Sequence, residues 1–368
     1  MVYQLLTMKR YSSGPLVRLA TLATPALLLA TGACSGPSAR PLGAPSASPR
    51  TDTQPPSEVQ RQPDSQSPGT SAPGGPASKA GAAGAGVPRP SKKLSVLEAS
   101  RYMLALVNRD RATQGLAPVE LDDGAPTQAG QAHAEDMARL GFLGHWGSDG
   151  SVPEQRHTEA GGADMVLENA LCFTDEAKRT LDAKPLIDPV QVERAESLFF
   201  DEVPPNDGHR KNILKPGHTK VGIGVAQPIS TATEIAVPCF TQEFTDGYGT
   251  YAALPKRAKV GAVLHVEGIM NGGARPSGVG VARVVRPAPI APSELNKRRS
   301  YPVPKPFQMY WGPGFVTPIP VKIDGPRLAV DVPLSDRAQP GLYEISVWAK
   351  LGKSEEHTMV SLRTIVVE

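Results

Sequence analysis

The sequence predicts an α+β fold, in which a layered domain of helices and antiparallel strands precedes a second, all-β domain. Three observations support this prediction. Apolar residues recur at helical spacing in several segments between residues 95 and 204. Between residues 220 and 244 they alternate with period two, as in strands. Beyond residue 251, short strand-like segments are separated by Gly/Pro turns, and no helical period intervenes.

The first ordered element is a helix that begins after Ser95. Ser95 and Glu98 form the signature of a capping box, in which each side chain accepts a hydrogen bond from the other residue's backbone N–H. Gly115 provides the stop signal. The predicted buried face consists of Val96, Ala99, Met103, Leu106 and Val107.

Two further helices are expected before the strands. One spans about residues 126–140, ends at Gly141 and carries His133 on its buried face. The other has Asp188 as N-cap and Pro189 at its first position, and it ends before Pro204.

The strands follow in two groups. Those of the first domain are expected at 220–226 and 235–244. Those of the second fit a β-sandwich, with an immunoglobulin-like arrangement as one candidate, and are expected at 260–267, 279–285, 328–334, 342–350 and 360–367.

The N-terminus has the features of an export signal. Basic residues precede a short apolar run that ends in Thr31-Gly32-Ala33-Cys34, within a predicted signal peptide at 1–33. This resembles a bacterial lipoprotein cleavage site, so Cys34 is predicted to carry a lipid that anchors the protein to a membrane. Secretion after a nearby cut is the alternative. Residues 34–94 are rich in Pro, Ser, Ala and Gly, and predict a disordered tether.

These features predict an exported protein at the outer surface, in the periplasm or outside the cell. The net charge of +3 is too small to indicate nucleic acid binding. If Cys34 is lipidated, Cys172 and Cys239 remain in an oxidising compartment. They form either a disulfide or two separate buried thiols.

A series of short motifs occurs in a recognisable order between about residues 107 and 225. Each motif alone is weak, but their order and spacing resemble the bacterial SCP-like branch of the CAP superfamily. The resemblance covers about residues 95–250 and implies an α-β-α sandwich there. The β-sandwich that the strand pattern predicts occupies 251–368. The motifs are Val107-Asn108-x-x-Arg111, His133-Ala134-x-Asp136, Phe142-x-x-His145, Arg156-x-x-x-x-Gly161, Glu168-Asn169, Gly208-His209-Arg210-x-Asn212 and Val221-Gly222-Ile223-Gly224.

The resemblance also implies a cleft with two histidines and two glutamates, at His145, Glu168, Glu202 and His209. His145 and His209 are the candidate metal ligands, with Zn²⁺ as the candidate ion, and Glu168 and Glu202 are the candidate general bases. Glu202 is the weakest match, because Phe199 stands where the family has tryptophan. It lies on the apolar face of its helix or in a frayed, solvent-facing last turn.

The remaining histidines have structural interpretations. His133 is expected to be packed and hydrogen-bonded in the core. The others match no motif and are expected at the surface or in strands: His157, His218, His265 and His357.

Three functions are compatible with these residues. The first is binding of a small ligand, lipid, glycan or peptide in the cleft, with or without a divalent metal. The second is metal-assisted hydrolysis, for which two histidines are fewer ligands than the usual three. The third is adhesion through the C-terminal β-sandwich.

Overall fold

The computed structural model describes residues 6–8, 86–232, 235–298 and 300–368. Cys34, most of the predicted signal peptide and most of the tether lie outside these residues. No helix in the described part of the chain has the length and apolar character needed to cross a membrane.

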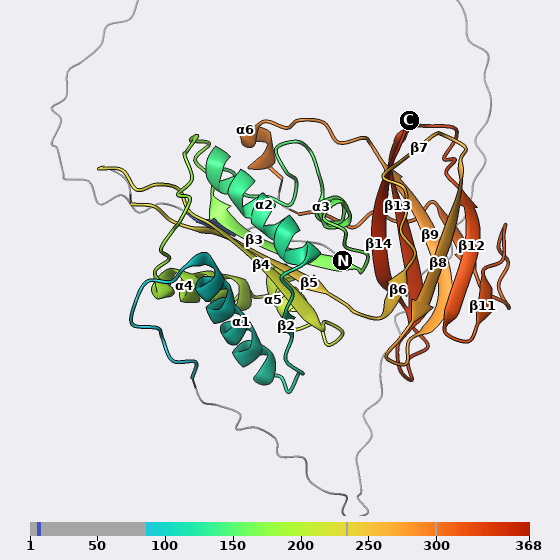
Figure 1. The fold of residues 1–368 in the computed structure, drawn as a ribbon, viewed down its shortest axis with the longest axis horizontal. Coiled ribbons are helices and arrows are strands. Elements are labelled where there is room, and N and C mark those ends of the chain that lie inside the picture. The colour runs from blue at the N-terminus through green and yellow to red at the C-terminus, as the bar shows by residue number, and fades with distance from the viewer. Residues whose placement is uncertain (1–5, 9–85, 233–234, 299) are drawn as a thin grey trace, which may run out of the picture. The chain divides into compact units, whose positions relative to one another are not determined.

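A five-stranded sheet forms the middle layer of the N-terminal region, in the order β1-β3-β5-β4-β2 (Figure 1). Strands β3, β5 and β4 pair antiparallel, whereas β1 and β2 add in parallel at the two edges. The strands are β1 (Leu6–Met8), β2 (Glu120–Leu121), β3 (Val166–Phe173), β4 (Lys220–Ala226) and β5 (Cys239–Thr245).

Helices cover both faces of this sheet, which confirms the layered α+β prediction. Helix α2 (Ala125–Leu140) lies on one face with α3 (Pro153–Glu159) beside it (Figure 1). On the other face lie α1 (Val96–Ala112), α4 (Pro189–Phe200) and α5 (Gly208–Ile213).

The predicted helix signals are present as hydrogen bonds. Ser95 and Glu98 form both contacts of the capping box, and the Asp188 carboxylate accepts from the N–H of Val190. Gly141 ends α2 in a left-handed conformation at φ 66°. Local side-chain chemistry therefore sets where these helices begin and end.

Two glycines of β4 let α2 approach the sheet closely. A Cβ at Gly222 would lie 2.3 Å from the carbonyl carbon of Pro126, and one at Gly224 would lie 2.4 Å from that of Gly130. Any larger residue would push the helix away, which gives the Gly-x-Gly motif a packing reason.

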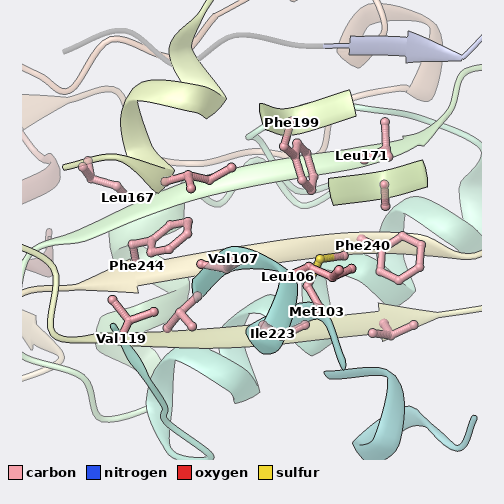
Figure 2. Close-up of a cluster of buried hydrophobic side chains, with 14 of the residues drawn as sticks. Met103, Leu106, Val107, Val119, Leu167, Leu171, Phe199, Ile223, Phe240 and Phe244 are labelled. Carbon is pink, nitrogen blue, oxygen red and sulfur yellow. The ribbon is translucent and has the colours of Figure 1, made fainter. Parts of the chain in front are cut away.

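The main core fills the space between the sheet and α1 and α4. Figure 2 shows Met103, Leu106 and Val107 of α1 facing the strands. Phe199 of α4 joins Leu167 and Leu171 of β3 in the same cluster. On the opposite face, Cys172 and Cys239 of neighbouring strands are joined by a disulfide.

The C-terminal region consists of two facing sheets, in the orders β10-β9-β13-β14-β7 and β11-β12-β8-β6. Their inward-facing apolar side chains form a second core. The strands are β6 (Gly249–Tyr251), β7 (Arg257–Ala258), β8 (Val263–Met270), β9 (Arg275–Val284), β10 (Gln308–Trp311), β11 (Lys322–Asp324), β12 (Arg327–Pro333), β13 (Gly341–Lys350) and β14 (His357–Val367).

The outer face of the first of these sheets is covered by the N-terminal region. Val360 accepts a hydrogen bond from the N–H of Met165 at 3.1 Å, and the N–H of Thr364 donates to Thr158 Oγ1 at 3.2 Å. Apolar and polar residues alternate along β13, which predicts that Glu344 and Ser346 face solvent. The contact with the N-terminal region buries both of them instead.

A segment between β9 and β10 crosses back over the N-terminal region. We call it the strap: residues 285–307, apart from residue 299, which includes α6 (Pro292–Leu295). The N–H of Ile290 donates to the carbonyl of Ser148 at 2.8 Å, and Asn296 Oδ1 accepts from the N–H of Leu143 at 3.0 Å. Leu295 is buried in a core cluster with residues of α2 and β3. The two regions are therefore joined by packing as well as by the chain.

Candidate functional site

The four predicted site residues form two histidine–glutamate pairs. His145 Nδ1 donates to Glu168 Oε1 at 2.8 Å, and His209 Nδ1 donates to Glu202 Oε1, also at 2.8 Å. The two imidazole rings are 6.3 Å apart between centroids and tilted by 52°. The fold thus brings together residues that are up to 64 positions apart in the sequence, counted from 145 to 209.

The first pair is built from β3 and the loop that follows α2. Glu168 lies in the buried strand β3. His145 follows the glycine stop of α2, and His133 Nε2 donates to the carbonyl of Gly144 at 2.7 Å to hold this loop. His133 is therefore a buried, hydrogen-bonded residue that positions its neighbour.

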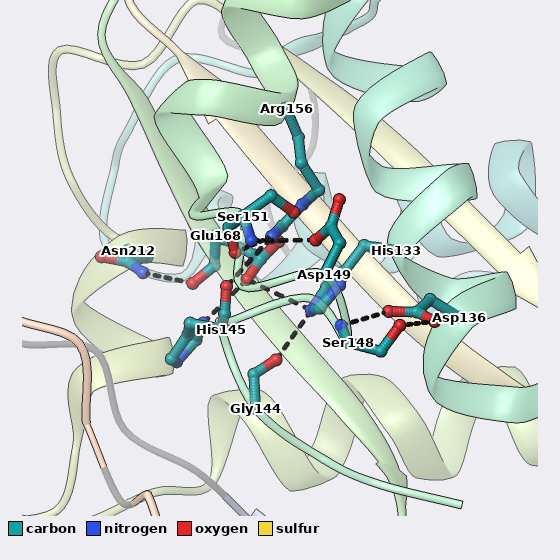
Figure 3. A network of polar contacts seen from close by, with 10 residues as sticks. All are labelled: His133, Asp136, Gly144, His145, Ser148, Asp149, Ser151, Arg156, Glu168 and Asn212. Atoms are coloured by element: carbon teal, nitrogen blue, oxygen red, sulfur yellow. Dashed lines mark hydrogen bonds and ion pairs between the residues drawn. The ribbon is translucent and has the colours of Figure 1, made fainter. Parts of the chain in front are cut away.

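Arg156 of α3 completes the first pair. Its Nη2 donates to Glu168 Oε2 at 2.6 Å, while Nη1 and Nη2 both donate to the His145 carbonyl at 3.1 Å. Figure 3 shows this guanidinium, Glu168 and His145 converging from three elements. Both carboxylate oxygens of Glu168 are thereby engaged.

The charges around Glu168 keep it ionised. Burial alone would raise the pKa of this carboxyl, but Arg156, His133 and His145 together outweigh burial and lower the pKa below its usual range. Glu243 lies directly opposite on β5, where burial and the charge of Glu168 raise its pKa well above the usual value. The pKa values of these two facing carboxyl groups are therefore displaced in opposite directions.

The second pair lies where α4 ends and α5 begins. Glu202 lies two residues beyond the end of α4 at Phe200 and is buried. It is therefore neither on the helix face nor in solvent, the two positions that were predicted. Its Oε2 accepts from the backbone N–H of His209 at 2.8 Å, and its Oε1 binds the ring. The carboxylate thus also satisfies an N–H in the first turn of α5.

An amide network connects the two pairs. Asn212 Nδ2 donates to the carbonyl of Glu168 at 3.3 Å and to Asn169 Oδ1 at 2.9 Å. Asn169 Nδ2 in turn donates to the carbonyl of His209 at 3.2 Å. These bonds give Asn169 a structural role, since its side chain locks α5 onto β3.

The site is more enclosed than the open cleft that the resemblance implies. His145, Glu168 and His209 are 0% exposed and Glu202 is 8% exposed. Burial lowers the pKa of His209, despite the opposing effect of Glu202, so this ring is neutral near pH 7. Its Nε2 atom is buried and has no hydrogen-bond partner in the part of the chain that the structure describes.

The residues do not fit a zinc site with three protein ligands. The imidazoles supply two nitrogen donors, whereas both carboxylates already use their oxygens on histidines, Arg156 or backbone. Within the described residues, no group of three or more His, Cys, Asp or Glu side chains has a metal-holding arrangement.

Two of the remaining histidines are placed differently from the prediction. His157 and His218 are buried, at 2% and 3% exposure, rather than at the surface. His218 Nδ1 donates to Asp246 at 2.5 Å and its ring stacks on Phe244. These rings fill core positions next to β5 and α3, where the surrounding sequence has no regular apolar period to reveal them.

Sequence reasoning also missed two contributors to the site. Arg156 belongs to the motif Arg156-x-x-x-x-Gly161, and it is the fourth residue of a helix that begins with Pro153. This position is the sequence signal that could have indicated its role. Glu243 gives no such signal, because it lies in a strand whose seven residues are all buried.

Residues 104–235 match the family model of the cysteine-rich secretory protein family, CAP, so the chain carries a CAP domain in this range. An uncharacterised protein of Bacillus subtilis strain 168, YkwD, is 26% identical over 140 residues. That match covers 38% of this chain and 47% of the relative, so it spans about half of the relative's length.

Proposed function

We propose that this is an exported, envelope-associated CAP-domain protein that binds a small polar ligand at the paired histidines and does not turn it over. The observation that carries this proposal is the orientation of the two rings. Each Nδ1 is held by a glutamate, and this contact fixes the tautomer in which Nε2 carries the lone pair.

The chemistry of His209 indicates the kind of ligand. A neutral ring whose Nδ1–H points at Glu202 offers Nε2 as a hydrogen-bond acceptor. The complementary ligand group is a donor, such as a sugar hydroxyl, an amine or a peptide N–H. Glycans and peptides fit this requirement better than a purely hydrocarbon lipid does.

The contacts of the glutamates favour binding over hydrolysis. A general base must be free to take a proton and needs a pKa near the working pH. Glu168 has a lowered pKa and is held by Arg156 and His145. Both oxygens of Glu202 accept hydrogen bonds from His209. Neither carboxylate is placed to activate a water molecule.

Export is supported by the N-terminal sequence and by the disulfide. A basic segment, an apolar run and the Thr31-Gly32-Ala33-Cys34 sequence predict secretion with a lipid anchor at Cys34. The Cys172–Cys239 disulfide is typical of an oxidising compartment outside the cytosol.

Thermal shift measurements on the full chain test the binding proposal. The probes are chitotriose, trialanine and Zn²⁺, each with wild type and His209→Asn. Asparagine keeps a donor at the Nδ1 position and has no atom at the Nε2 position. His265→Asn, at an exposed position of β8 in the C-terminal region, is the matched control.

We expect chitotriose or trialanine to raise the melting temperature of wild type and the control but not of His209→Asn. A ligand at 100 times its Kd stabilises by about 2.7 kcal/mol. Equal shifts in all three proteins, or no shift with either probe, would contradict the proposal. Any Zn²⁺ shift should disappear in His145→Ala/His209→Ala. Cleavage of trialanine by wild type and not by Glu168→Gln would instead establish the hydrolase.

A further inference from the structure

A cavity lies beneath the strap, separate from the paired histidines. It has a volume of about 560 Å³, within the range of small-molecule sites. Its walls come from the loop after His145, from the strap and from Leu342 of β13. Most of the lining is apolar, including a run of prolines and valines.

The cavity has an aromatic corner with a cation on it. Trp146 and Tyr301 meet edge to face, with ring centroids 5.0 Å apart. The Arg298 guanidinium carbon lies 4.5 Å above the Trp146 ring. The Arg298 guanidinium has no ion pair or hydrogen bond to the described residues, so its N–H donors remain available next to an apolar surface.

The charge of the lining has one sign. Of the described residues that line the cavity, the two charged ones are Arg286 and Arg298. Arg286 lies 3.2 Å from Glu368, and none of the described residues that line the cavity carries a carboxylate. An apolar cavity in which the Arg298 guanidinium is unopposed complements a ligand with an apolar body and one anionic group.

We propose that this strap cavity binds an organic anion whose apolar body lies on Trp146 and Tyr301 and whose anionic group binds Arg298. The cavity depends on the strap being seated. Gly150 allows this, because a Cβ at this position would lie 2.3 Å from the carbonyl oxygen of Ala288 and its φ is 85°. The site therefore exists only while the C-terminal region packs on the CAP domain.

Fluorescence titration of the full chain with 8-anilinonaphthalene-1-sulfonate tests this proposal. The dye has an aromatic body and a single sulfonate, and N-phenyl-1-naphthylamine is its uncharged counterpart. We expect saturable binding of the sulfonate, with energy transfer from tryptophan that decreases in Trp146→Phe. Arg298→Gln should weaken sulfonate binding about tenfold or more, because it removes a charge-assisted contact. Its effect on the uncharged dye should be less than twofold.

Two controls locate the effect. Arg327→Gln changes an exposed arginine of β12 and should leave both dyes unaffected. His209→Asn should also bind the sulfonate normally. The test of the strap cavity is therefore independent of whether the paired histidines bind a ligand. Gly150→Val should weaken binding by displacing the strap. Absence of sulfonate binding to wild type, or equal binding by Arg298→Gln, would overturn the proposal.

Discussion

Each of the two histidine–glutamate pairs contains an Nδ1–carboxylate hydrogen bond, but the two pairs are stabilised in different ways. Glu168 lies in the middle of a buried strand and is held by His145 and by the guanidinium of Arg156. Glu202 lies at a helix junction and accepts two bonds from His209, with no cation paired to it among the described residues. The same ring orientation is therefore obtained once by a buried ion pair and once by a helix terminus.

This difference has consequences for stability. A buried carboxylate that loses its cation is left as an uncompensated charge, whereas one that loses a neutral hydrogen bond is less affected. The first pair should thus be sensitive to any change in charge. The second should respond mainly to changes in the backbone at the start of α5.

The largest effect is expected from Arg156→Met. This change leaves Glu168 charged, buried and without its strongest partner, so the free energy of unfolding should fall by about 3–5 kcal/mol. Urea denaturation gives the value. The double variant Arg156→Met/Glu168→Gln should recover part of the loss, because the unpaired charge is gone. A double variant as unstable as the sum of the two single ones would contradict the ion-pair account.

Acid should also destabilise the first pair. Burial, assisted by Arg156, lowers the pKa of His133 to about 4 from 6.5, so the unfolded chain takes up this proton first. Stability from the neutral ring is complete above about pH 6.5 and is lost as the pH falls toward 4. The lowered pKa of Glu168 adds a further loss below its ordinary value of 4.5.

His133→Gln isolates the histidine part of this acid effect. The variant should lose roughly 3 kcal/mol less stability than wild type between pH 7 and pH 4, measured by urea denaturation at each pH. His265→Gln, an exposed strand residue, should retain the wild-type profile. Identical profiles for His133→Gln and wild type would show that His133 is not the group that titrates.

The smallest effect is expected at the second pair. Glu202→Gln keeps an oxygen that can accept from the backbone N–H of His209 and loses the ionic acceptor, so the cost should be about 1–2 kcal/mol. Asp201→Asn, at the exposed neighbouring position, is the control. A loss as large as that of Arg156→Met would remove the distinction between the two pairs.

The sequence predicted those parts of the fold that depend on local signals. The capping box at Ser95, the stop at Gly141 and the cap at Asp188 placed three helices, because each signal is a contact within one turn. Strand β4 alternates and was located at its observed bounds, Lys220–Ala226. In the C-terminal region five strands of the two facing sheets were located approximately.

The parts that local patterns missed depend on contacts between distant segments. All eight residues of β3 are buried, including Glu168 and Asn169, so the strand has no alternation. The strap reads as a proline-rich connection, yet it buries Leu295 against the CAP domain. The convergence of His145 and His209 was implied by resemblance alone, since no spacing rule joins residues on separate elements.

The central claim is that a glutamate on Nδ1 leaves Nε2 of His209 as a lone-pair acceptor. Histidine ¹⁵N NMR of the full chain at pH 7 measures this most directly, with His209→Asn to assign the signal. We predict a protonated Nδ1 and an unprotonated Nε2 for His209. A proton on Nε2, or a ring protonated at both nitrogens, would contradict the proposed binding chemistry.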